Sequence, residues 1–122
     1  MNSKQPDPRA YFRVAVSIPV RYRLDGRIGH AAGWINDLSG GGIKLVTEED
    51  LPANSVIALR FALPDSEEPI HARGRVVLSY RDDPRGRYAH GVRFTAIDGA
   101  QREMIVRYVH KLQLMRLQEG KR

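Results

Sequence analysis

Cysteine is absent from this sequence of 122 residues, which excludes two kinds of architecture at once. Without thiols the chain can form neither a disulfide framework nor a cysteine-based metal site, and nothing in it requires an oxidising compartment. Long apolar runs are absent too, since no stretch approaches the ~18 apolar residues of a membrane helix and residues 1–8 are polar. We therefore expect a cytoplasmic protein without membrane insertion.

The common sequence patterns of enzyme active sites are also absent. The histidines lie far apart, without the spacing of metal ligands: His30, His71, His90 and His110. No G-x-S-x-G or phosphate-loop pattern occurs, and Ser39 has no identifiable base. We expect a protein that is not an enzyme, with no catalytic residues, no metal site and no cofactor.

The net charge of +6 is unevenly distributed along the chain. Residues 1–13 carry three basic and one acidic side chain, residues 99–122 carry six and two, and residues 14–98 carry eleven of each. A domain that follows a nucleic-acid backbone across its own surface should not be neutral. The charge distribution therefore favours a local anion site near one end and disfavours nucleic acid as the partner.

Most of the chain has the patterns of strands separated by turns. Residues 14–24 alternate apolar and polar side chains, as in a half-buried strand, and Pro19 among them is typical of an edge strand or bulge. Asp25 and Gly26 predict a hairpin whose return strand ends near Trp34. The six predicted strands span residues 14–24, 27–35, 43–46, 56–63, 70–80 and 88–94.

The C-terminal segment changes to a helical period. Its apolar side chains recur at spacings of three and four: Met104, Ile105, Tyr108, Val109, Leu112 and Met115. Asp98 fits an N-cap, and Gln101 stands three residues later, where a capping box requires it. We interpret the basic face of this helix as a solvated surface, formed by Arg102, Arg107, Lys111 and Arg116.

These elements predict an all-β protein with one helix, a six-stranded antiparallel β-barrel closed by a C-terminal α-helix. The expected organisation is a flexible N-terminal segment over residues 1–13 and a barrel over residues 14–98. A helix over residues 99–117 and a tail over residues 118–122 follow.

Two segments have the residue types of an anion-binding site. Arg9 and Arg13 precede the first strand, and the planar guanidinium fork suits phosphate oxygens and the N7 and O6 acceptors of guanine. A solvated basic tail is the alternative interpretation. The hairpin is expected to return Asp37 to the end of the barrel where Arg13 enters.

The second segment runs from Asp37 to Gly42 and reads D-L-S-G-G-G. Its carboxylate can accept the N1 and N2 protons of a guanine, while glycines allow a ligand to approach the backbone amides closely. The alternative is a turn in which Asp37 and Ser39 bond their own backbone and the glycines supply positive φ. Taken alone, the segment does not distinguish the two.

Together the two segments resemble the PilZ domain, the bacterial cyclic di-GMP receptor module, whose signature is R-x-x-x-R followed by [DN]-x-S-x-x-G. The matching positions are Arg9, Arg13, Asp37, Ser39 and Gly42. The stretch at residues 91–94 and the closing helix are also similar to that family, so the resemblance covers nearly the whole chain.

The resemblance implies a binding mode. Arg9 and Arg13 would contact the phosphates and a guanine Hoogsteen edge, while the second segment would line a guanine through Asp37, Ser39 and Gly42. Further candidate ligand contacts are Gly40, Gly41 and Gly91. Family members that hold an intercalated ligand dimer often have another arginine where this chain has Pro8, which favours one ligand per site.

The function implied is that of a cytoplasmic effector, which orders its N-terminal arginine segment over cyclic di-GMP and passes the signal to a protein partner. Two alternatives stay open. A single-stranded nucleic-acid-binding barrel would use Tyr11, Phe12 and Trp34 as stacking platforms, although aromatic residues in strands are more often core. A PilZ-like adaptor would bind protein without any nucleotide.

Overall fold

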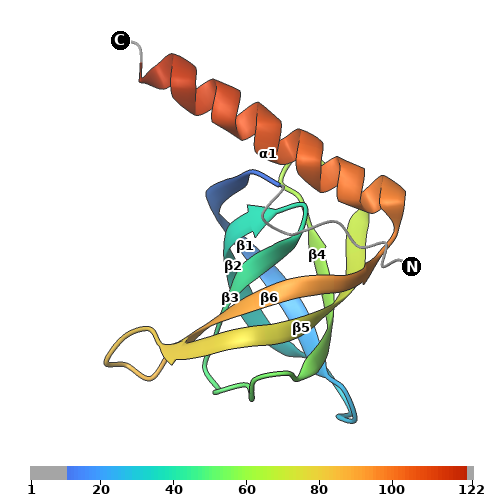
Figure 1. Cartoon of the computed structure of the whole chain (residues 1–122), viewed down its shortest axis with the longest axis vertical. Coiled ribbons are helices and arrows are strands. Elements are labelled where there is room, and N and C mark those ends of the chain that lie inside the picture. The colour runs from blue at the N-terminus through green and yellow to red at the C-terminus, as the bar shows by residue number, and fades with distance from the viewer. Residues whose placement is uncertain (1–10, 121–122) are drawn as a thin grey trace, which may run out of the picture.

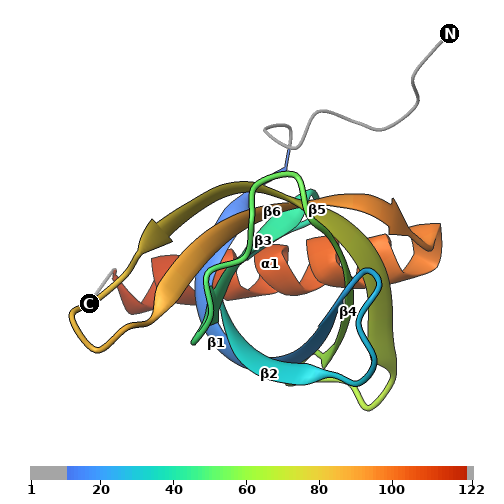
Figure 2. The same cartoon turned by 90° about the horizontal axis from the view of Figure 1, so that it is seen from below.

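The computed structural model describes residues 11–120 and has one closed antiparallel barrel and one helix, as predicted (Figures 1 and 2). Around the barrel the strands follow the order β1-β2-β3-β6-β5-β4. Their bounds are β1 (Arg13–Leu24), β2 (Ala31–Ser39), β3 (Gly42–Thr47), β4 (Val56–Ala62), β5 (Pro69–Arg81) and β6 (Tyr88–Ile97). The helix α1 (Gly99–Glu119) lies across one end of the barrel and extends past it (Figure 1).

The alternating pattern of β1 explains how the barrel closes. Ile18, Val20 and Tyr22 point into the core, while the residues between them face outward. Pairing with β4 begins only at Arg21, two residues beyond Pro19, and a bulge interrupts the pairing with β2 just before this proline. The expected association of Pro19 with an irregular stretch of strand is confirmed, because proline cannot donate a ladder hydrogen bond.

The connection between β1 and β2 differs from the tight hairpin that the sequence predicts. Six residues join the strands, with positive φ at Gly26 and Gly29. The return strand therefore begins at Ala31 instead of residue 27 and continues to Ser39, so that Trp34 lies inside it rather than near its end. The turn-forming residues from residue 36 predict a loop, but the strand continues through a bulge between Ile35 and Asp37, after which Leu38 and Ser39 are both buried.

The helix α1 begins as expected at Asp98, whose carboxylate accepts hydrogen bonds from the amides of Ala100 (2.8 Å) and Gln101 (3.4 Å). The predicted capping box is wrong, because the Gln101 side chain bonds β5 instead. Its oxygen accepts from the His71 amide at 2.9 Å and its nitrogen donates to the Pro69 carbonyl at 3.0 Å. Gln101 thus joins the first turn of the helix to the barrel.

The apolar stripe of α1 is buried only where the barrel lies beneath it. Ile105 and Val109 are fully enclosed, whereas Met115 is exposed because the last turns extend beyond the barrel (Figure 1). The helix also continues through Gln118 and Glu119, which were expected to belong to the tail, since both are good helix formers and Gly120 provides the stop. Among residues 11–120, no helix is both long and apolar enough to cross a membrane.

The basic face of α1 is not simply solvated, which corrects the sequence interpretation. Arg102 donates to the Gly40 carbonyl at 3.0 Å and Arg116 donates to the Ala15 carbonyl at 2.7 Å. Lys111 forms an ion pair with Asp65 at 3.3 Å. These side chains attach the helix to one end of the barrel, at the β2–β3 turn, the start of β1 and the β4–β5 connection.

Candidate ligand-binding site

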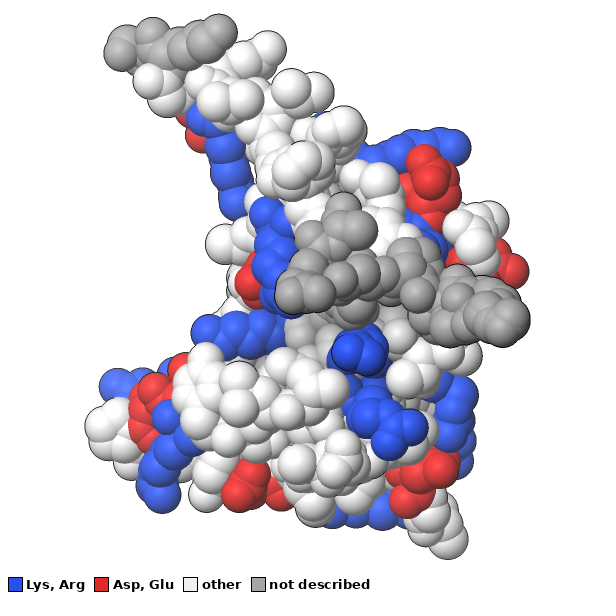
Figure 3. Space-filling model, in the orientation of Figure 1, with Lys and Arg blue, Asp and Glu red and all other residues white. Residues whose placement is uncertain are grey.

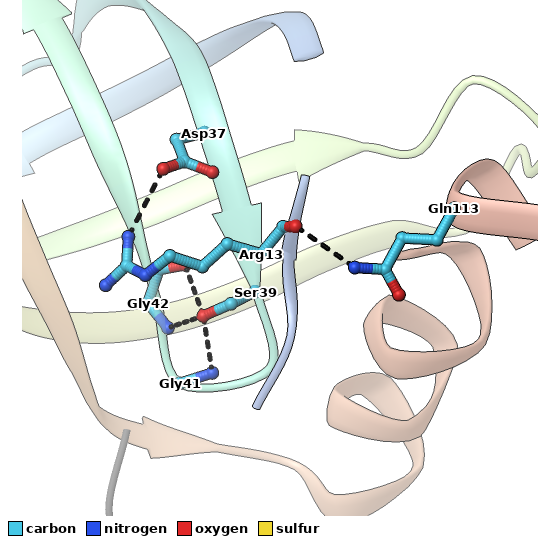
Figure 4. Close-up of polar contacts among 6 residues, drawn as sticks. All are labelled: Arg13, Asp37, Ser39, Gly41, Gly42 and Gln113. Carbon is cyan, nitrogen blue, oxygen red and sulfur yellow. Dashed lines mark hydrogen bonds and ion pairs between the residues drawn. The ribbon is translucent and has the colours of Figure 1, made fainter. Parts of the chain in front are cut away.

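The two halves of the sequence motif meet at the end of the barrel below α1. Arg13 is the first residue of β1 and pairs with Ser39 of β2, and two residues later Ala15 pairs with Asp37. The guanidinium Nη1 of Arg13 donates to Oδ2 of Asp37 at 3.4 Å, although 24 residues separate them in the sequence (Figure 4). The predicted return of Asp37 toward Arg13 is therefore correct. Arg9 lies outside the described residues.

The Arg13–Asp37 pair remains open to solvent. The two side chains are 55% and 30% exposed, so their ion pair adds little to the stability of the fold. Each side chain also keeps free capacity, because a guanidinium has five N–H donors and a carboxylate accepts several hydrogen bonds. The Arg13 backbone is fixed independently, since its carbonyl accepts from the Gln113 side chain of α1 at 3.3 Å (Figure 4).

Ser39 lies inside the β2–β3 turn and not on the surface that carries Arg13 and Asp37. It is completely buried, and its hydroxyl accepts from the amides of Gly41 (3.1 Å) and Gly42 (3.2 Å) while donating to the Gly42 carbonyl at 3.3 Å (Figure 4). The hydroxyl therefore holds the β2–β3 turn together. In this arrangement the amides of Gly41 and Gly42 already have a partner and are not available to a ligand.

The turn hypothesis is correct in that the Ser39 hydroxyl bonds the backbone of its own turn, but wrong in that the glycines do not supply positive φ. Gly40 and Gly42 are instead needed for close packing. Among the described glycines, positive φ occurs only at Gly26, Gly29 and Gly86. A Cβ at Gly42 would lie 2.1 Å from the carbonyl oxygen of Val92, and one at Gly40 would lie 2.6 Å from the Tyr11 ring. Gly42 therefore lets β3 lie against β6, and Gly40 lets the chain before β1 close over the turn.

A row of outward-facing residues, which the motif does not include, continues from Asp37 across the barrel. Asp37 pairs with Lys44 of β3, and Lys44 pairs with Gly91 of β6, which in turn lies opposite Leu78 of β5. The Lys44 ammonium lies 5.9 Å from the centre of the Tyr80 ring. Lys44 was detectable in principle, because it is the only lysine among residues 14–98 and follows the motif directly.

Gly91 leaves an open strip on this surface. A Cβ there would meet only ordinary contacts, at 3.6 Å from Val77 and 3.7 Å from Leu78, so backbone crowding does not require the glycine. Leu78 and Tyr80 are both exposed beside it. The expected involvement of Gly91 therefore remains a prediction, and the row adds a cation and apolar side chains to the Arg13–Asp37 pair.

Aromatic side chains connect the start of β1 to α1. Tyr11 lies under the Arg102 guanidinium, 5.6 Å from its carbon to the ring centre, and Phe12 stacks on His110 with a centroid distance of 6.1 Å. A small cavity of about 200 Å³ lies between these rings and the helix residues Val106 and Val109. The segment that carries Arg13 is thereby in contact with the helix.

The fold is a closed six-stranded barrel with one terminal helix, and an exposed arginine–aspartate pair lies at one end of it. The PilZ domain model matches residues 7–111, and the chain belongs to the PilZ domain family. No curated protein sequence matches the chain. Among residues 11–120, no group of three or more metal-binding side chains occurs.

Solved PilZ structures share the fold at low sequence identity. The Bacillus subtilis inhibitor of motility MotI/DgrA superposes with a TM-score of 0.77 and 18% identity, covering 91% of this chain and 54% of that one. The PilZ domain of Escherichia coli YcgR, solved with c-di-GMP, gives 0.70 and 14%, covering 95% and 99%. Borreliella burgdorferi PlzA, in complex with c-di-GMP, gives 0.61 and 16%, covering 90% and 53%. The chain thus spans about half the length of MotI/DgrA and PlzA.

Proposed function

We propose that this chain is a non-enzymatic receptor for cyclic di-GMP. The observation that carries the proposal is the Arg13–Asp37 pair, in which two motif residues far apart in sequence face each other at 3.4 Å on an exposed surface. Membership of the PilZ family and the c-di-GMP complexes of YcgR and PlzA support the choice of ligand. A guanine nucleotide suits the pair chemically, because it offers acceptors to the arginine and N–H donors to the carboxylate.

In the proposed complex, the ligand separates Arg13 from Asp37 and bonds to both. Arg9 and Arg13 contact the phosphates and the Hoogsteen edge of a guanine, and Asp37 accepts its N1 and N2 protons. Ser39, Gly40, Gly41 and Gly42 act by shaping the β2–β3 turn, since the hydroxyl is buried and bonded within the turn. One ligand occupies the site, because Pro8 replaces a further arginine.

The signal is proposed to pass through the arginine segment. Tyr11 contacts Arg102 of α1, and Phe12 contacts His110 of α1. A ligand that binds Arg9 and Arg13 therefore also changes the contacts of these two aromatic rings with the helix. Ordering of this segment over the ligand creates a new surface beside α1, to which a cytoplasmic protein partner binds.

Isothermal titration calorimetry with cyclic di-GMP tests the proposal, with GMP and cyclic AMP as comparison ligands. We expect Arg13→Ala to weaken binding by about 2–4 kcal/mol, which is the scale of lost hydrogen bonds between charged groups. Arg107→Ala is the matched control, since the ion pair that Arg107 forms within residues 11–120 is with Glu103 on the exposed side of α1. Equal affinities of wild type and Arg13→Ala would reject the site, and absence of binding by the wild type would favour the adaptor alternative.

A further inference from the structure

A groove lies on the outer surface of the barrel, where β1 and β4 separate, away from the Arg13–Asp37 pair. Since their pairing ends at Arg21 and Arg60, the strands leave a groove of about 530 Å³ beyond this point. Its floor is made of small or flat residues, including Pro19 and Ala32, and Trp34 of β2 stands at one side. This volume falls in the range of small-ligand sites, roughly 300–1,000 Å³.

Two arginines face each other at the closed end of this groove. Arg21 and Arg60 are Cα partners on neighbouring strands, and both side chains are exposed. Like charges directly opposite each other destabilise a sheet. Within residues 11–120, no carboxylate forms an ion pair with either arginine, although Glu67 also borders the groove. The pair therefore suits an anion from outside the chain.

Trp34 is half exposed, at 48%, on the outer face of β2. It is the only tryptophan of the chain and is not part of the core, contrary to the usual place of aromatic residues in strands. An exposed indole beside paired guanidiniums combines a stacking surface with a phosphate-binding group.

Residues 14–98 have no net charge, but the structure separates their basic residues from their acidic ones. The six strands contain nine basic residues and a single acidic one, Asp37, whereas nearly all other acidic residues lie in the connections. Arg75 and Arg93 form a second directly opposed pair, on β5 and β6. In Figure 3, basic side chains lie near the middle of the barrel face, while both basic and acidic side chains lie around its edges.

Further arginines connect the two opposed pairs along the outside of the barrel. Arg23 follows Arg21 at the next outward position of β1, and Arg73 precedes Arg75 in the same way on β5. Outward positions on one strand are about 6.6 Å apart. Ala58 of β4 lies between Arg23 and Arg73, and Arg73 forms an ion pair with Asp25 at 2.9 Å, so these side chains form a basic band that Asp25 partly neutralises. A band of this kind suits an extended polyanion better than a single small anion.

We propose that the groove and the arginine band bind single-stranded nucleic acid. One base stacks on Trp34, its phosphate lies between Arg21 and Arg60, and the following phosphates lie along the band. A single strand is required because a base within a duplex is already stacked and cannot reach the indole. This activity is additional to cyclic di-GMP binding, since the groove lies between β1 and β4 and contains none of the motif residues.

The single tryptophan provides the measurement. We expect oligothymidylate, which contains no guanine, to quench Trp34 fluorescence of the whole chain at low salt. The double variant Arg21→Ala/Arg60→Ala should bind roughly tenfold more weakly. Its slope of log affinity against log salt should be smaller by about 1.4, because two phosphate contacts are lost and each contributes about 0.7 on a single strand. The matched control Arg85→Ala/Arg107→Ala removes the same charge from other surfaces and should retain most of the affinity and the steep slope.

Comparison ligands identify the class of anion that the groove binds. Absence of quenching by oligothymidylate, or equal binding by the Arg21/Arg60 variant, would overturn the proposal. Equal quenching by thymidine monophosphate would indicate a site for free nucleotides instead of a strand, and equal quenching by polyglutamate would indicate an acidic protein surface; either result also overturns it. Arg13→Ala should leave oligothymidylate binding unchanged, so failure here and failure of the cyclic di-GMP site are separate results. Circular dichroism of each variant checks that it folds.

Discussion

Gly42 of β3 faces the carbonyl oxygen of Val92 so closely that a Cβ on Gly42 would lie 2.1 Å from that oxygen. The obstacle is backbone and cannot rotate away, so any side chain at this position must separate β3 from β6. The last position of the motif is therefore a requirement of the barrel itself, independent of any ligand.

Gly42→Ala should for this reason destabilise the fold. We expect the free energy of unfolding, measured by urea denaturation, to fall by about 3 kcal/mol, the upper part of the range for overpacking. Gly91→Ala is the matched control, because its Cβ would make only ordinary contacts and it should change stability by less than about 1 kcal/mol. Equal stabilities of the two variants would contradict this account of Gly42.

We expect Ser39 to contribute mainly to stability and Asp37 mainly to ligand binding. Ser39→Ala leaves the buried amides of Gly41 and Gly42 without their acceptor, so we expect a loss of about 1–3 kcal/mol in the free energy of unfolding. Asp37→Asn removes only an exposed ion pair and should cost less than about 1 kcal/mol.

The same two variants should rank differently in binding. Calorimetry at a temperature where both are folded should show that Asp37→Asn loses more affinity for cyclic di-GMP than Ser39→Ala, because only Asp37 presents its oxygens at the surface. If Ser39→Ala lost more affinity while remaining fully folded, the hydroxyl would have to turn outward in the complex.

The sequence predicted those features that depend on short-range patterns. Alternation in β1, the helical stripe of Ile105 and Val109 and the N-cap Asp98 each follow from neighbouring residues, and each has the predicted structure. The hairpin that returns Asp37 to Arg13 also followed, because strand direction is set by the turn.

Features that depend on distant segments were not predictable in this way. The side chain of Gln101 suits a capping box, but only the fold reveals that the edge of β5 offers it two backbone groups. The direction of Ser39 depends on a bulge between Ile35 and Asp37, which arises from the pairing of β2 with β3 and leaves both Leu38 and Ser39 buried. Likewise, a charge total cannot reveal that basic residues lie in the strands and acidic ones in the connections.

Limited proteolysis tests the ordering of the arginine segment. Trypsin should cleave after Arg9 in the free protein, whereas Arg13 is already paired in β1, and saturating cyclic di-GMP should suppress this cleavage because the ligand engages the Arg9 guanidinium. Cleavage after Arg85 in the β5–β6 connection serves as the internal control and should proceed at the same rate. Equal rates before Val14 with and without ligand would remove the ordering step while leaving the binding site intact.

His90 should make the barrel sensitive to mild acid. The ring is completely buried, with Nε2 at 2.9 Å from the Thr47 hydroxyl and Nδ1 at 2.8 Å from the Ser79 hydroxyl. Burial lowers the pKa of His90, although the carboxylates of Glu49 and Asp50 act in the opposite direction. An unfolded histidine has a pKa of about 6.5, so the unfolded chain takes up this proton at a higher pH than the folded one.

The stability contributed by neutral His90 is therefore complete above about pH 6.5 and is lost as the pH falls toward its folded pKa. We expect the free energy of unfolding to decrease between about pH 7 and pH 5, the range in which an unperturbed histidine takes up its proton. His90→Gln should flatten this slope even if it lowers stability throughout, whereas His71→Gln, at an exposed position of β5, should retain it. If the free energy of unfolding of His90→Gln depended on pH as steeply as that of the wild type, the acid sensitivity would come from groups other than His90.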